Sequence, residues 1–154
     1  MVRYDIATDW LEYCPWGIKS VEHTTEAFKE WAGPRDKIQG FCCDNAPEHV
    51  GAAKQRGWRC AAATTGMPQN NGLVERLVRT SMDGGRCNIA QSGALSKWWP
   101  RAVKCYSFGH NVAMRDGDSP CNKRHKQAHC KSLLIPLGAH VQYMPQPDTK
   151  KEFV

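Results

Sequence analysis

Two acidic residues in this chain lie where they can share a metal ion. Asp44 ends a short apolar run, and Glu75 stands near the start of a helical pattern that begins at Leu73. A loop rich in Gly, Pro and Asn precedes that helix. Such an arrangement can bring two distant carboxylates together, and hard oxygen ligands suit Mg²⁺ or Mn²⁺. The chemistry is metal-assisted phosphoryl transfer, in which two ions about 3.5–4 Å apart activate the nucleophile and stabilise the leaving oxygen.

Residues around Glu75 are suited to binding DNA. The side-chain amides of Gln69, Asn70 and Asn71 can donate to phosphates or base edges. Arg76, Arg79 and Arg86 can contact phosphates, and at 100° per residue Arg79 and Arg86 share one helix face with Glu75. Both groups also have simpler explanations, namely ordinary turn chemistry for the amides and a solvated basic face for the arginines.

Hydrophobic periodicity and turn residues predict the elements that position these side chains. Asn45 is the expected N-cap of the second helix, and Leu73, Val74 and Leu77 the expected buried stripe of the third, which should weaken or end at Gly84-Gly85. The predicted strands and helices, in chain order, are strands 2–7 and 10–18, helix 21–32, strand 38–43, helix 47–56, strand 58–63, a loop over 64–72 and a helix from Leu73.

Beyond Gly85 the prediction is coarser. Ser96 is expected to cap a further helix, in which Trp98 and Trp99 are expected to be core residues rather than platforms for stacked bases. Residues 115–120 have loop chemistry, residues 133–143 are expected to form one or two strands, and the last ten residues should be irregular. Strands followed by alternating helices and strands indicate a mixed α/β fold.

Composition restricts the class of protein. The chain has 154 residues, enough for one domain with a real core, and its net charge of +6 favours a polyanionic partner. We expect no membrane association, because the sequence contains neither an apolar run of membrane-spanning length nor a secretory leader. Eight cysteines without such a leader suggest reduced thiols in the nucleus or cytoplasm. Whether the chain forms a homo-oligomer is left open.

A zinc site is a further alternative. Cys121, His125, His129 and Cys130 are ligand types that zinc prefers. The final His-Cys adjacency is awkward for a tetrahedral site, so we expect no zinc there.

Two sequence blocks resemble the integrase catalytic core of copia-type retrotransposon polyproteins. The first is Asp44-Asn45-x-x-Glu48, and the second is Pro68-Gln69-x-Asn71-Gly72-x-x-Glu75-Arg76. The resemblance implies a ribonuclease-H-like core, with a central mixed sheet flanked by helices, over residues 1–112 and a C-terminal extension over 113–154. It also implies DNA integration by Mg²⁺- or Mn²⁺-dependent polynucleotidyl transfer, with Asp44 and Glu75 as the second and third acidic ligands.

The chain departs from the family pattern at its beginning. The first strand of such a core and the catalytic Asp that it carries have no counterpart, so we expect an N-terminally truncated fragment with little activity. Asp5 and Asp9 are the only acidic residues before the second strand. One of them substituting for the missing ligand remains an alternative. The rival function is a non-catalytic module that binds nucleic acid or another protein and derives from a mobile element.

Overall fold

The computed structural model describes residues 1–15, 17–34, 38–62, 72–126 and 134–142. They form a mixed α/β structure, which confirms the predicted fold class at this level. The strands make two separate two-stranded sheets, so the single central sheet that was expected is not formed by the described residues.

An antiparallel hairpin opens the chain. Strand β1 (Val2–Asp5) pairs with β2 (Trp10–Tyr13), with Val2 opposite Tyr13 and Asp5 opposite Trp10. Strand β1 ends earlier than predicted, because a turn with Asp9 in the left-handed region (φ 60°) closes the hairpin. Strand β2 also ends earlier than predicted, at Tyr13. Leu11 and Tyr13 are buried, in the alternating pattern typical of a strand with one covered face.

The next segment folds as a helix–strand–helix–strand unit. Helix α1 (Val21–Ala32) has the predicted bounds, and Ser20 caps it by accepting a hydrogen bond from the backbone N–H of His23. Strand β3 (Gly40–Cys43) runs parallel to β4 (Arg59–Ala62), and α2 (Pro47–Gln55) connects them. The core of this unit consists of Phe28, Ala52, Ala53 and Trp58.

The N-cap of α2 is Ala46, so the prediction of Asn45 is wrong by one position. Pro47 occupies the first helical turn, where its fixed φ suits a helix and its missing N–H costs nothing. The carbonyl of Ala46 accepts from the backbone N–H groups of His49 and Val50, and no side chain caps this end.

The helical pair α3 (Gly72–Ser92) and α4 (Trp99–Val112) forms the other half of the molecule. Helix α3 passes through Gly84-Gly85 without a break, contrary to the prediction. The reason is close packing: a Cβ at Gly85 would lie 2.5 Å from Cγ2 of Val103, which is buried in α4. A short 3₁₀ turn, η2 (Ser96–Trp98), begins where the capped helix was expected and leads into α4.

Two C-terminal predictions had different outcomes. Residues 115–119 form the predicted loop, a turn with a bridge between Arg115 and Asp118, and helix α5 (Pro120–His125), which was not predicted, follows with Ser119 as its N-cap and Pro120 in its first turn. The expectation of strands at the C-terminal end is wrong for residues 134–142, which contain a turn at Leu137-Gly138 and no strand. Gly138 has a φ of 79° there, and a Cβ on it would lie 2.8 Å from that of Ser92.

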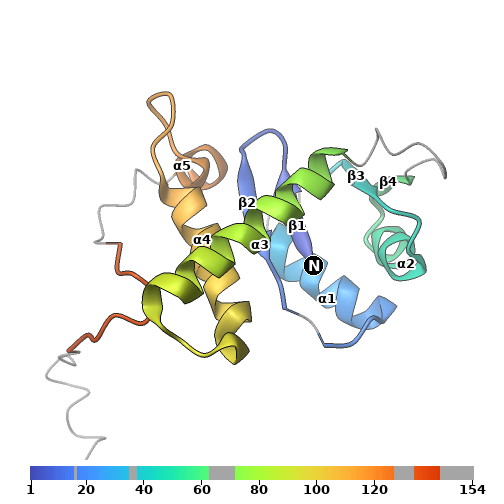
Figure 1. Cartoon of the computed structure of the whole chain (residues 1–154). Helices are drawn as coiled ribbons and strands as arrows, with labels where there is room; N and C mark the ends of the chain where they lie inside the picture. Colours follow the sequence, from blue (N-terminus) through green and yellow to red (C-terminus); the bar gives the residue numbers. More distant parts are fainter. Residues whose placement is uncertain (16, 35–37, 63–71, 127–133, 143–154) are drawn as a thin grey trace, which may run out of the picture.

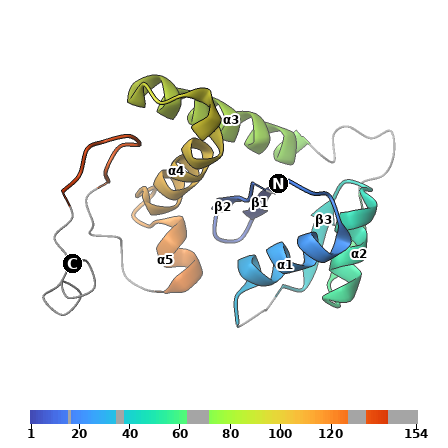
Figure 2. The same ribbon diagram turned by 90° about the horizontal axis from the view of Figure 1, so that it is seen from below.

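The β1–β2 hairpin lies between the two halves, with α4 and α5 on one side and α1, α2, β3 and β4 on the other (Figures 1 and 2). Asn111 fixes α4 to the hairpin, since its side-chain amide accepts from the N–H of Leu11 at 2.9 Å and donates to its carbonyl at 2.7 Å. On the other side the buried Arg3 donates to the carbonyl of Ala27 in α1.

Candidate functional site

Asp44 directly follows β3, as the sequence predicted, and its side chain is 62% exposed. Its Oδ1 lies 2.8 Å from Nδ1 of His49, one turn into α2. This contact orients the carboxylate and leaves its second oxygen open to solvent or to an ion. His49 was not predicted as a site residue, although its position five residues after Asp44 in the first turn of a helix is visible in the sequence.

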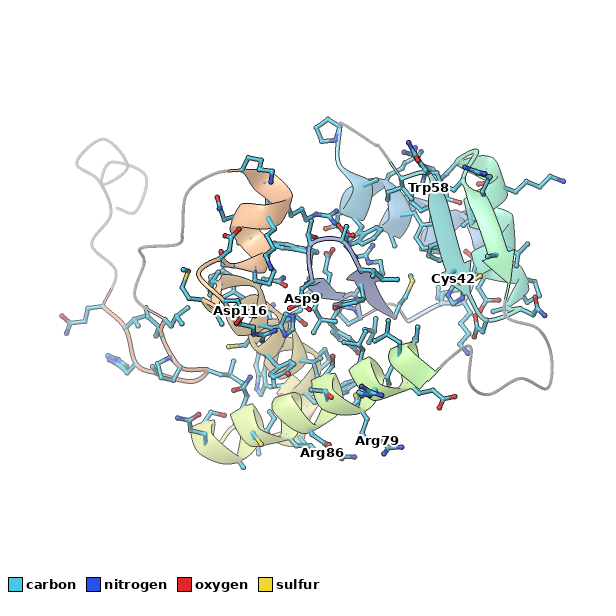
Figure 3. The ribbon with its side chains drawn as sticks, turned by 90° about the horizontal axis from the view of Figure 1, so that it is seen from above. Asp9, Cys42, Trp58, Arg79, Arg86 and Asp116 are labelled. Carbon is cyan, nitrogen blue, oxygen red and sulfur yellow. The ribbon has the colours of Figure 1, made fainter. Side chains whose placement is uncertain are left out.

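The residue before Asp44, Cys43, pairs with a second cysteine on the neighbouring strand. Sγ of Cys43 is 3.5 Å from Sγ of Cys60 on the neighbouring strand. Burial, a hydrogen bond with Cys60 and the nearby charge of Asp44 raise the pKa of the Cys43 thiol to about 12. Cys43 is therefore a neutral thiol at physiological pH and adds no negative charge beside Asp44. Cys42, the residue before Cys43 on β3, is exposed (labelled in Figure 3).

Glu75 lies in the first turn of α3, and its side chain is exposed. Arg76, Arg79 and Arg86 are exposed as well, and Figure 3 shows Arg79 and Arg86 projecting from α3 on the side away from the strands. Arg86 also bonds Asp83 at 2.8 Å in an exposed pair, which contributes little to stability.

The predicted buried stripe of α3 is wrong at two of its three positions. Leu73 is 43% exposed and Val74 is 45% exposed, while Leu77 is half-buried. Helix α3 packs on α4 and β1, and this packing covers Ser81 and Gly85 instead. The exposed first turn therefore presents Glu75 beside apolar and basic side chains.

Asp44 and Glu75 belong to different halves of the molecule. Asp44 follows a strand that packs on β4 and α2, whereas Glu75 belongs to a helix that packs on α4 and β1. The predicted DNA contacts Gln69, Asn70 and Asn71 lie outside the described residues. In the described part of the chain, no three His, Cys, Asp or Glu side chains group closely enough to hold a metal ion.

Asp5 and Asp9, the two candidates for a substitute acidic ligand, are both engaged elsewhere. Asp5 accepts from the N–H of Ala7, the hydroxyl of Thr8 and the guanidinium of Arg124. Asp9 accepts from the Tyr4 hydroxyl at 2.8 Å and from Arg115 at 2.9 Å, and it lies 3.3 Å from Nε2 of His110. Partial burial opposes ionisation of Asp9, but the Tyr4 hydrogen bond and the interactions with His110 and Arg115 prevail and lower its pKa. Both carboxylates stabilise the hairpin and its contacts.

The four residues weighed as an alternative zinc cluster are only partly described. Cys121 and His125 are one turn apart in α5, and His129 and Cys130 lie outside the described residues. The ring of His125 packs edge-on against Trp10, with ring centroids 4.9 Å apart. Among the cysteines that the structure describes, none forms a disulfide.

The prediction that Trp98 and Trp99 are core residues is wrong. Trp98 is 46% exposed and Trp99 is 40% exposed. Beside them lies an apolar cavity of about 310 Å³ between the end of α3 and the start of α4. Its lining residues are Met82, Gly85, Arg86, Ile89, Ala90, Ser96 and Trp99. Hydrophobicity alone suggested burial for both tryptophans, and nothing in their spacing indicated the open end of the helical pair.

No helix in the described ranges combines the length and apolar character that crossing a membrane requires. The candidate site residues thus lie on two elements, Asp44 at the end of β3 and Glu75 with its arginines on the exposed face of α3. No protein-family model matches this chain, and neither does any curated protein sequence.

Proposed function

We propose that this chain is a ribonuclease-H-like domain of the retrotransposon-integrase type, which binds DNA and carries two acidic ligands, Asp44 and Glu75, of a Mg²⁺ or Mn²⁺ site. The observation that carries this proposal is that both carboxylates are solvent-exposed at element ends, one after a parallel strand and one in the first turn of a helix. Two sequence blocks of the integrase type surround these same residues. The order strand, strand, helix, strand, helix, strand, helix supports the finer fold assignment.

The residues fit a hard divalent ion. Both side chains offer ionisable oxygen donors, and His49 engages only one oxygen of Asp44. When bound, the ion would polarise a phosphodiester and help to generate the attacking oxygen nucleophile. His49 positions Asp44, and the neutral thiol of Cys43 leaves the local charge to the carboxylate. Arg76, Arg79 and Arg86 would neutralise the phosphates of a strand that crosses α3.

A second candidate is a non-catalytic nucleic-acid-binding or interaction module derived from a mobile element. The contacts of Asp5 and Asp9 favour it, because both carboxylates are committed to hydrogen bonds and ion pairs within the fold. The two candidates share the basic face of α3 and differ in whether Asp44 and Glu75 support chemistry. For both we place the action on DNA in the nucleus or cytoplasm, with homo-oligomerisation open.

Duplex binding tests what the two candidates share. We expect the affinity for a labelled DNA duplex to fall with salt, and Arg79→Gln and Arg86→Gln each to reduce the slope of log K against log salt by about 1. Lys54→Gln is the matched control, since Lys54 is exposed on α2 in the other half. The α3 assignment fails if Lys54→Gln reduces the slope as much as the arginine variants do.

Mn²⁺-dependent nicking and end-joining of the same duplex separates the candidates. Activity that disappears in Glu75→Gln identifies an integrase-like transferase. If the wild-type chain binds the duplex and neither nicks nor joins it, the non-catalytic module is the better description.

A further inference from the structure

The open end of the α3–α4 pair is rich in aromatic and basic side chains. Trp98 and Trp99 follow one another at the junction of η2 and α4, and both are exposed. The ammonium of Lys97 lies 6.0 Å from the centroid of the Trp98 ring, and the guanidinium of Arg101 lies 5.8 Å from it. We call this group, Trp98 with Lys97 and Arg101, the tryptophan platform.

The chain segment that carries the tryptophan platform has charges of one sign. The sequence contains no Asp or Glu between Gly84 and Val112, whereas Arg86, Lys97, Arg101 and Lys104 fall in that interval. Lys97, Arg101 and Lys104 are exposed. Negative charge together with flat apolar groups would complement these exposed cations and indole rings.

We propose that the tryptophan platform and the adjoining cavity bind unpaired bases of single-stranded nucleic acid. A base stacked on an indole ring gains more than an exposed cation–π contact provides. A base can therefore replace a cation at the Trp98 ring, and the displaced Lys97 or Arg101 can then pair with a phosphate. Stacking tolerates any base, because every base has a π-face.

The cavity supplies a second position for a base. At about 310 Å³ it reaches the size of the smaller ligand sites in proteins. Its walls are mainly apolar, while Arg86 and Ser96 contribute the polar groups at its lining. Trp99 forms one wall and is held from behind by Tyr13, with ring centroids 5.6 Å apart, so this wall is fixed before a ligand arrives.

The arginine face of α3 connects this position with Glu75. Arg79 and Arg86 project on the same side of α3 (Figure 3), and Arg86 also lines the cavity. Arg86 lies eleven positions after Glu75 in the helix, or about 16 Å along it at the helical rise. A strand that crosses this face spans on the order of five nucleotides at 3.4 Å each, within the usual range of single-strand sites.

This inference rests on the proposed function, DNA binding. It specifies the substrate class as DNA with an unpaired end. The platform would hold unpaired nucleotides while the arginines hold the backbone that leads to Glu75.

The test compares binding of a labelled oligothymidylate of about ten nucleotides with binding of a labelled duplex, by fluorescence anisotropy. We expect Trp98→Ala to weaken single-strand binding about tenfold and duplex binding less than about twofold. Trp98→Phe should recover most of the loss, because a smaller ring still stacks. Phe108→Ala, at a 53% exposed aromatic elsewhere on α4, is the matched control and should bind as wild type.

Trp98 is 46% exposed, so Trp98→Ala should fold; circular dichroism checks this. The proposal is overturned if Trp98→Ala binds the oligothymidylate as wild type does. It is also overturned if Trp98→Ala converts a dimer to a monomer, by sedimentation, without changing single-strand binding, because the face would then join two copies of the chain. A chain that binds neither DNA form would instead refute the proposed function, independently of Trp98.

Discussion

At the scale of single residues, contacts at the tip of the hairpin shift the pKa values of Tyr4 and Asp9 in opposite directions. Tyr4 donates to Asp9 at 2.8 Å, and Asp9 also pairs with Arg115 in the loop after α4. Burial first, and then the hydrogen bond and charge of Asp9, raise the pKa of Tyr4 from 10.0 to about 12. Asp9 has a lowered pKa for the complementary reason, because its ionised form is the one that Tyr4 and Arg115 bind.

We predict that Tyr4→Phe removes part of the alkaline loss of stability. Between pH 10 and about 12 the folded chain keeps the Tyr4 proton while the unfolded chain releases it, so stability falls as pH rises through this window. Without the phenol this contribution is absent, and the free energy of unfolding at pH 7 should drop by about 1 kcal/mol for the lost hydrogen bond. Urea unfolding over a pH series measures both effects.

Tyr106→Phe is the control for that prediction, because it leaves the Tyr4–Asp9 bond intact and should keep the full alkaline decline. An equal decline in Tyr4→Phe and wild type would show that Tyr4 does not titrate as described. On the acid side, the contribution of Asp9 is present above its unfolded pKa, near 3.8, and is lost as pH falls through its lower folded value.

At the scale of elements, sequence predicted the ends of helices and turns well where a single residue caps, starts or stops the element. Helix α1 has its predicted bounds because Ser20 caps it and Gly33, with a φ of 70°, ends it. The turn between β1 and β2 and the start of α2 at Pro47 follow from equally local chemistry. Short polar α5 was missed because six residues provide too little periodicity for a helix to be recognised.

The prediction that α3 weakens or ends at Gly84-Gly85 was wrong because it used local sequence alone. Gly84-Gly85 predicts a weak point when only helix propensity is considered. In the structure these positions let α3 approach α4, since a Cβ at Gly84 would lie 2.1 Å from the Tyr106 ring. Packing between helices far apart in sequence decides the outcome, and a single-residue propensity does not include it.

We predict opposite effects for two glycine substitutions in this helical pair. Gly85→Ala places a methyl group 2.5 Å from the buried Val103 side chain and should cost about 1–3 kcal/mol, reduced by the better helix propensity of alanine. Gly109→Ala in α4 meets no atom within 4 Å and should stabilise by about 0.5–1 kcal/mol. Thermal unfolding of both variants measures this, and stabilisation by Gly85→Ala would contradict the close packing of α3 on α4.

At the scale of the whole molecule, sequence could indicate candidate site residues but not the distance between them. Asp44 and Glu75 were found from their residue types and flanking blocks, and each lies at the element end that was predicted. Their relative position depends on how the α1–α2–β3–β4 half meets the α3–α4 half across the hairpin. That packing arises from contacts such as Asn111 with Leu11, 100 residues apart, which no periodicity reveals.

The same scale explains the errors over Trp98 and Trp99. Large aromatic residues are usually buried, and the sequence gives no sign that the end of the α3–α4 pair is left uncovered. Exposure of both rings beside Lys97 and Arg101 is a property of the assembled surface. In a chain with a net charge of +6, this surface carries the proposal of nucleic-acid binding made above.

The central claim is that Asp44 and Glu75 hold one divalent ion, and Mn²⁺ binding followed by electron paramagnetic resonance tests it most directly. Asp44→Asn and Glu75→Gln each remove one charged ligand and should weaken Mn²⁺ binding by about tenfold or more. Asp116→Asn is the control, since Asp116 is exposed in a separate turn and asparagine accepts its left-handed backbone. The account predicts weaker binding in the first two variants and wild-type binding in the control. Wild-type affinity in both Asp44→Asn and Glu75→Gln would contradict it.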